Sequence, residues 1–108
     1  MFGERLKGNL DLLLLAVLAV APAHGYQVLE RLRLRSDGAF DLPEGTIYPA
    51  LHRLEGRGWV TSSWVRVDGR NRRVYALTAD GRRQLAVQRQ EWAGFTAGVA
   101  AVLAGEPA

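Results

Sequence analysis

The dipeptide Asp68-Gly69 lies between two runs of strand-forming residues and restricts the fold more than any other feature of the sequence. Residues 59–67 are rich in β-branched and aromatic side chains, and residues 72–77 return to the same type. An Asp-Gly pair between two such runs is typical of a tight β-hairpin. The sequence therefore predicts one hairpin in the second half of the chain, with Asp68 and Gly69 at its tip.

Two helical patterns open the chain. The first is rich in Leu and Ala and is expected over residues 4–21, where Pro22 ends it. Its apolar run, residues 12–23, is shorter than the roughly 20 residues of a membrane-spanning helix. We interpret it as a buried core helix and not as the apolar part of a secretion signal. His24 is expected to be a turn or cap residue before a second, amphipathic helix over residues 26–35.

Two more helices are expected, one on each side of the hairpin. The third begins at Pro43, and its buried face follows helical spacing through Ile47, Leu51 and Leu54. Gly58 suits a left-handed cap at the end of this helix, and Thr78 suits the N-cap of a last helix that runs to about residue 103. The predicted order is helix, helix, helix, strand, strand, helix, which is a mainly α fold with a small β-hairpin.

Composition excludes several classes of function. The 108 residues support one domain and include no cysteine, which removes disulfides, thiolate catalysis and cysteine metal sites and fits a reducing cytoplasm. The two histidines, His24 and His52, belong to different predicted elements and make a poor metal site. No glycine-rich phosphate loop, nucleophile with a histidine partner or paired carboxylates are found, so neither an enzyme nor a cofactor is expected.

Positive charge is concentrated around the predicted hairpin. Residues 66–83 contain six arginines and two aspartates, whereas the net charge of the whole chain is only +3. A helix fits the major groove of DNA, and arginines on an adjoining hairpin can neutralise phosphates. Neighbours on a strand point to opposite sides, so Arg70 and Arg72 are expected to face DNA and Arg73 is not. The alternative is a solvated hairpin without a polyanionic partner.

Three motifs resemble those of the PadR-type repressors. They are His24-Gly25-Tyr26, residues 45–55 followed by Gly58-Trp59-Val60, and residues 69–81. Their order and gaps are similar to the family pattern over nearly the whole chain. The resemblance implies a winged helix-turn-helix DNA-binding domain over residues 1–78 and a C-terminal dimerisation helix over residues 79–108, as one structural unit of the family's compact subfamily.

By the same resemblance, the DNA-facing start of the recognition helix corresponds to Thr46, Tyr48 and Pro49, and the tip of the wing corresponds to Gly69, Arg70 and Arg72. Arg53 lies two turns along the helix and is expected to contact a phosphate. Other interpretations stay open: Tyr48 as a half-buried plug of the junction between helix and wing, and Pro49 as a tolerated first-turn proline. Val74 and Asn71 depart from the family pattern on the wing.

The last predicted helix carries a heptad-like apolar stripe with one polar layer at Gln88. The stripe comprises Leu85, Trp92, Phe95, Val99 and Val102. A chain of this size has little to cover it, so a homodimer is expected. In some compact members of the family, planar drugs stack on a tryptophan of this helix, and Trp92 corresponds to it. Trp92 is therefore either a binding residue for a small aromatic effector or only an anchor of the dimer.

These observations predict a transcription regulator that binds double-stranded DNA in a sequence-specific way. The expected form is a dimeric repressor on an inverted-repeat operator, released by a small molecule or another signal. The alternative is a winged-helix module for protein interactions that does not bind DNA. Neither hypothesis involves a membrane.

Overall fold

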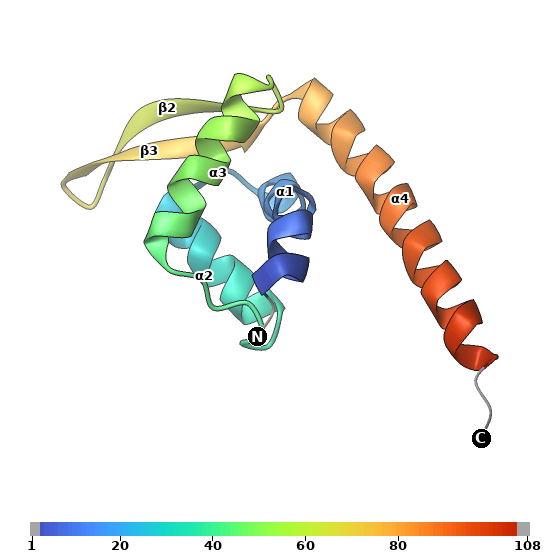
Figure 1. The fold of residues 1–108 in the computed structure, drawn as a ribbon. Coiled ribbons are helices and arrows are strands. Elements are labelled where there is room, and N and C mark those ends of the chain that lie inside the picture. The colour runs from blue at the N-terminus through green and yellow to red at the C-terminus, as the bar shows by residue number, and fades with distance from the viewer. Residues whose placement is uncertain (1–2, 106–108) are drawn as a thin grey trace.

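Four helices and a three-stranded antiparallel sheet make up residues 3–105, the part of the chain that this computed structural model describes (Figure 1). Side chains are described from Arg5 onward, except that of Lys7. The elements are α1 (Gly3–Val20), β1 (Ala23–His24), α2 (Gly25–Arg35), α3 (Glu44–Gly56), β2 (Val60–Val67), β3 (Arg70–Leu77) and α4 (Ala79–Ala104). The expected DNA-binding domain over residues 1–78 and the expected dimerisation helix over residues 79–108 each extend beyond the described part, by residues 1–2 and 106–108 respectively.

The core is formed between α1, α2, α3 and one face of the sheet. Leu14, Leu15 and Leu18 of α1 are almost fully buried, as the interpretation of its apolar run as a core helix requires. The predicted buried face of α3 is confirmed, because Ile47, Leu51 and Leu54 have no exposed surface. The core therefore holds α3 in place and leaves the side chains on its opposite face at the surface.

The strand β1 was not predicted and adds a third strand to the expected hairpin. Ala23 and His24 pair with Tyr75 and Val74 of β3. A two-residue strand has no periodicity of its own, so only its tertiary partner defines it. His24 is also the N-cap of α2: its Nδ1 accepts from Gln27 N at 3.3 Å, and its own N–H donates to Gln27 Oε1 at 3.1 Å. The expected cap role of His24 is confirmed.

The hairpin of β2 and β3 has the predicted tip. Asp68 has a φ of 50° and Gly69 a φ of 77°, the positive values that a type I′ turn requires at both central residues. Eight pairs join the strands in register, from Val60 opposite Leu77 to Val67 opposite Arg70. The second strand thus begins directly after the turn, two residues earlier than expected, because backbone pairing continues to the tip.

The end of α3 and the start of α4 are joined by backbone contacts. Gly58 has a φ of 78°, and its N–H donates to the carbonyl of Glu55 at 3.0 Å, which confirms the predicted left-handed end. Thr78 caps α4 as predicted: its Oγ1 accepts from Gly81 N at 3.0 Å and donates to the carbonyl of Gly58 at 2.6 Å. One hydroxyl therefore links the start of α4 to the end of α3.

Beyond its first turns, α4 leaves the core as an arm. Leu85 is only 6% exposed and belongs to the core of the same chain, so this member of the expected dimer stripe does not lie on a free surface. From residue 86 to residue 105, the last one described, no side chain of α4 is buried. The described chain measures 60 × 28 × 20 Å, and Figure 1 shows α4 extending away from the other elements.

None of the helices in residues 3–105 is long and apolar enough to cross a membrane.

Candidate nucleic-acid interface

The exposed face of α3 carries the residues expected to meet DNA. Thr46, Tyr48, Pro49 and Arg53 are all exposed, and His52 lies among them. The opposite face is buried, so α3 cannot rotate without exposing its core side chains. The structure therefore brings together the helical part of the predicted site on one surface, while its contact with DNA stays a prediction.

Tyr48 is half-exposed because its ring lies against the start of α2. A β-carbon built on Gly25 would be 2.5 Å from Cε1 and 2.8 Å from Oη of Tyr48. Only glycine leaves room for this contact, and Gly25 is the central residue of the first motif. The ring is still 39% exposed, so Tyr48 both fills the junction and reaches the surface.

Pro49 is the sixth residue of α3 and has no N–H to donate to the carbonyl of Gly45. Both residues are exposed, so water or a ligand can reach the carbonyl. A proline ring inside a helix also crowds the carbonyl of the residue four positions before it. The proline thus leaves the carbonyl of Gly45, in the first turn of α3, without its usual partner within the helix.

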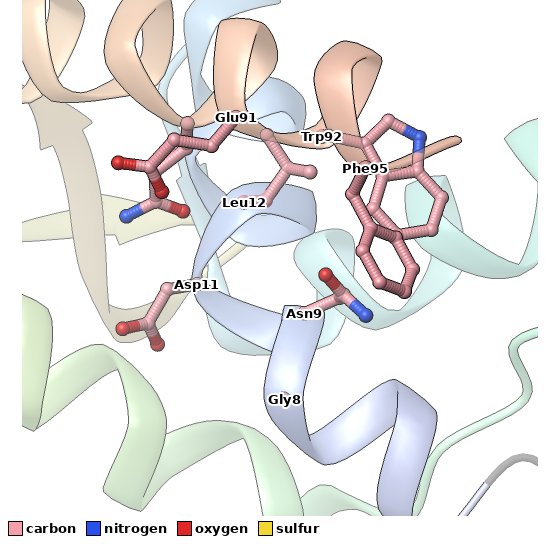
Figure 2. A pocket seen from close by; sticks show the side chains of 8 residues that line it. Gly8, Asn9, Asp11, Leu12, Glu91, Trp92 and Phe95 are labelled. Carbon is pink, nitrogen blue, oxygen red and sulfur yellow. The ribbon is translucent and has the colours of Figure 1, made fainter. Parts of the chain in front are cut away.

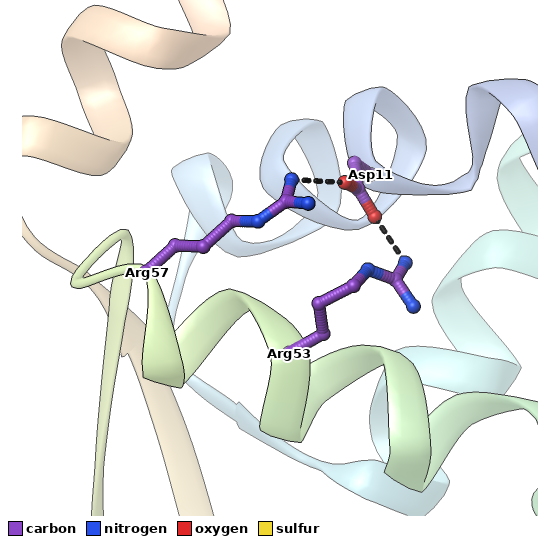
Figure 3. Close-up of polar contacts among 3 residues, drawn as sticks. All are labelled: Asp11, Arg53 and Arg57. Atoms are coloured by element: carbon purple, nitrogen blue, oxygen red, sulfur yellow. Dashed lines mark hydrogen bonds and ion pairs between the residues drawn. The ribbon is translucent and has the colours of Figure 1, made fainter.

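Asp11 of α1 accepts charge-assisted hydrogen bonds from one arginine of α3 and from the arginine that caps its C-terminal end (Figure 3). One is Arg53, and the other is Arg57, whose Nη1 lies 3.4 Å from Asp11 Oδ2. The Asp11 side chain is 21% exposed, and those of the arginines are 43% and 50% exposed. Sequence reasoning missed this contact, because no local pattern links residues that are 42 positions apart.

The two faces of the hairpin differ in their surroundings. We call the side that packs against α3 the α3-side face; it consists of residues 60, 62, 64, 66, 71, 73, 75 and 77. Val60 and Tyr75 on this face are buried, and Ser62 Oγ donates to Glu55 of α3 at 2.5 Å. The other side, the back face, carries Arg70 and Arg72, as strand alternation predicted.

Farther out on the α3-side face lies a pair that sequence reasoning did not select. The guanidinium carbon of Arg73 is 5.4 Å from the ring centroid of Trp64, and the two residues are cross-strand partners. Trp64 is 66% exposed. The signal was present as a strand-forming tryptophan beside a basic residue, but the sequence alone does not say which face of the hairpin meets α3.

Tyr75 connects this pair to α3. Burial raises the pKa of the Tyr75 phenol. The charge of Arg73 opposes this rise, and Glu55 and Tyr48 add to it slightly. Tyr75 itself is only 1% exposed, so it belongs to the core and not to the exposed surface that carries Tyr48 and Trp64.

A cavity separates the arm α4 from α1. Figure 2 shows Trp92 and Phe95 of α4 facing Asn9 and Leu12 of α1 across it. A neighbouring cavity of about 410 Å³ also includes Trp92, together with Leu6, Leu13 and Phe40 among others. The Trp92 and Phe95 rings lie 6.0 Å apart and remain 43% and 63% exposed.

Farther along α4, a shallow apolar groove is lined by Gly94, Phe95, Gly98, Val99, Val102 and Leu103. Four of the five residues expected in the dimer stripe are thus on the surface of the arm. Among the side chains that the structure describes, no three histidine, aspartate or glutamate residues converge as metal ligands.

A helical core that presents one exposed helix beside a basic two-stranded hairpin defines a winged helix-turn-helix protein. The sequence model of the Transcriptional regulator PadR-like family matches residues 14–87. The chain therefore belongs to the PadR-like family of transcriptional regulators, which confirms the resemblance seen in its motifs.

Similar proteins agree with this assignment. Transcriptional regulator Rv3488 of Mycobacterium tuberculosis is 42% identical over 67 residues, which are 62% of this chain and 60% of that protein. The crystal structure of a PadR family transcriptional regulator from Eggerthella lenta superposes with a TM-score of 0.84 at 30% identity, covering 98% of this chain and 91% of that one. A PadR-like regulator from Bacillus cereus gives 0.81 at 27% identity, with 94% and 97% covered. These relatives are transcriptional regulators and not enzymes.

Proposed function

We propose that this protein is a sequence-specific DNA-binding repressor that acts as a homodimer on an inverted-repeat operator. The observation that carries the proposal is the exposed face of α3, where Thr46, Tyr48 and Pro49 stand on a helix whose other face is fixed in the core. A helix presented in this way fits the major groove, and its first residues reach the base edges.

The charges around α3 support binding to a polyanion. Arg53 lies on α3 and Arg57 caps its end. The tip of the hairpin adds Arg70 beside Gly69, with Arg72 partly exposed behind them. Arginines at phosphates release counterions and give an affinity that falls steeply with salt. Part of this charge is already neutralised, because Asp11 pairs with Arg53 and Arg57.

The arm α4 supports the dimer. Trp92, Phe95, Val99 and Val102 are exposed large apolar side chains on a helix that the described chain leaves uncovered. A second copy of α4 would cover them, and Gly94 and Gly98 would allow close approach. A twofold dimer would present two α3 helices to half-sites about 34–36 Å apart.

A small aromatic molecule in the cavity beside Trp92 is the effector we propose. The volume of about 410 Å³ lies within the range of small-molecule sites. Because the cavity lies between α1 and the arm, an occupant that fits one angle of α4 better than another would change the spacing of the two α3 helices. Titration with planar aromatic compounds, followed by tryptophan fluorescence, tests this part. Trp92→Phe, which keeps Trp59 and Trp64, is the control.

Selection of bound duplexes from a random DNA pool at physiological salt tests the function itself. We expect enrichment of an inverted repeat whose half-sites are about one helical turn apart. The alternative, a winged-helix module for protein interactions that does not bind DNA, would instead be supported by two results. No common sequence would be recovered, and the Pro49→Ala variant would bind DNA no less than the wild-type protein.

A further inference from the structure

The hairpin carries an exposed aromatic side chain paired with a partly exposed arginine, and none of the expected contacts uses this pair. Trp64 is 66% exposed, and the guanidinium of Arg73 lies over its ring at 5.4 Å. The two are cross-strand partners, so the antiparallel register holds both side chains on the same face. A single exposed aromatic residue is ordinary on a protein surface. What matters at this site is the face on which the pair lies.

That face is the one that packs against α3. Ser62, two residues before Trp64, donates to Glu55 of α3, and Tyr75, two residues after Arg73, is buried. Strand residues two apart share a side, so Trp64 and Arg73 continue the α3-side face outward. From Ser62 to the end of β2 the strand extends about 16 Å. Figure 1 shows the outer hairpin projecting beyond α3.

The back face is directed elsewhere. Arg72 lies on this face together with Val74, which pairs with His24 of β1. The cross-strand partner of Arg72 is Val65, which is 42% exposed. A duplex that lies on the exposed side of α3 meets the α3-side face of the hairpin before it meets this one.

We propose that Trp64 and Arg73 form the duplex-facing surface of the hairpin and contact the sugar-phosphate backbone beside the groove that α3 occupies. This inference rests on the proposed DNA-binding function. It reverses the expectation that Arg72 faces DNA and Arg73 does not.

The chemistry of this surface fits that occupant. No residue of the α3-side face is acidic, and Arg66 adds a further positive charge to it. The adjacent carboxylate, Glu55, already accepts a hydrogen bond from Ser62. A guanidinium stacked on an aromatic ring is held in place and keeps N–H groups for a phosphate. The indole supplies an apolar face for a deoxyribose.

The chain offers a matched control on the same two strands. One pair of variants, Arg73→Gln and Arg72→Gln, removes one charge from each of two adjacent positions on opposite faces. The other pair, Trp64→Ala and Val65→Ala, removes one exposed apolar side chain from each face. Affinity for the selected operator is measured for all four full-length variants over a range of salt concentrations. Circular dichroism verifies folding, and Trp64→Thr replaces the alanine variant if that variant is unfolded.

We expect Arg73→Gln to reduce the slope of log affinity against log salt by about 1 per protomer, with little change for Arg72→Gln. Trp64→Ala should weaken operator binding about fivefold or more, and Val65→Ala should not. Equal effects of the two arginine variants, or a larger effect of Arg72→Gln and Val65→Ala, would overturn the proposal.

The two proposals fail in different ways. If wild-type protein enriches an operator and Pro49→Ala weakens its binding, while Trp64→Ala and Arg73→Gln bind like wild type, only the assignment of the hairpin face is wrong. If the wild-type protein selects no operator and binds duplexes with no dependence on salt, the DNA-binding function is wrong and the hairpin inference fails with it.

Discussion

Gly25 and Tyr48 are in contact across the helix-turn-helix: a β-carbon on the glycine would lie 2.5 Å from Cε1 of the tyrosine ring. Gly25 is the first residue of α2, and Tyr48 lies on the exposed side of α3. The contact fixes the direction in which the phenol reaches the surface. It therefore links the stability of the two helices to the geometry of the proposed DNA site.

Gly25→Ala should destabilise the protein and displace Tyr48. The added methyl group overfills a packed contact, so we expect a loss of about 1–3 kcal/mol in the free energy of unfolding, measured in urea. Gly8→Ala is the matched control, because Gly8 is a helical glycine with nothing within 4 Å of its added β-carbon. It should stabilise the protein by up to about 1 kcal/mol. Equal stability of the two variants would contradict the contact.

The stability of the fold should decrease below pH 6.5 because of His24. Burial lowers the pKa of His24 from its ordinary value of 6.5, and the charges of Arg72 and Arg31 lower it further. The folded state therefore favours the neutral imidazole, whose Nδ1 accepts the N–H of Gln27. Above pH 6.5 this contribution is complete. As the pH falls toward the folded pKa, the unfolded chain takes up a proton that the folded chain does not.

Chemical unfolding between pH 8 and pH 5 measures this contribution. His24→Asn keeps a residue suited to the N-cap but does not titrate, so its unfolding free energy should vary less with pH. His52→Asn, at an exposed site on α3, should behave like wild type. The explanation is wrong if the His24 variant loses as much stability on acidification as the wild-type protein.

Asp11→Asn should change DNA affinity more than stability. Its ion pairs with Arg53 and Arg57 are partly exposed, so their loss should lower the free energy of unfolding by less than about 1 kcal/mol. If the proposed function holds, the two released arginines and the lost negative charge should raise affinity for any duplex and steepen its salt dependence.

Glu30→Gln is the control for Asp11→Asn. Glu30 forms an ion pair with Arg33 within α2, and its substitution removes the same negative charge from the protein. Fluorescence anisotropy with an unrelated duplex, at low and high salt, compares the two variants. An equal gain in affinity would mean that only net charge changed, and that Asp11 does not keep Arg53 and Arg57 from binding DNA.

Combined Trp92→Glu and Val99→Glu substitutions should produce monomers. Both side chains are more than 40% exposed on the arm, and two charges on each copy would meet across the proposed seam. Light scattering of the purified protein measures the mass. Ala97→Glu, on the opposite side of α4, should leave a dimer intact. An unchanged mass for the double variant would exclude this stripe as the interface.

Much of the secondary structure was predictable because its signals are local. Asp68-Gly69 specified the hairpin, Gly58 the end of α3, and Thr78 the start of α4, since each depends on the backbone conformation or hydrogen bonding of a few neighbouring residues. The spacing of Ile47 and Leu51 likewise separated the buried side of α3 from the side that bears Thr46 and Pro49. The helical part of the candidate site was therefore visible in the sequence.

The rest was decided by tertiary packing. β1 exists only because Ala23 and His24 meet β3, and Leu85 fits the heptad stripe but is buried in its own core. No local pattern pairs Asp11 with Arg53. Strand alternation correctly placed Arg72 and Arg73 on opposite faces of the hairpin. Alternation within a strand does not, however, show which face packs against another element. Only the packing of α3 on one face of the sheet shows which of the two arginines lies on the same side as the recognition helix.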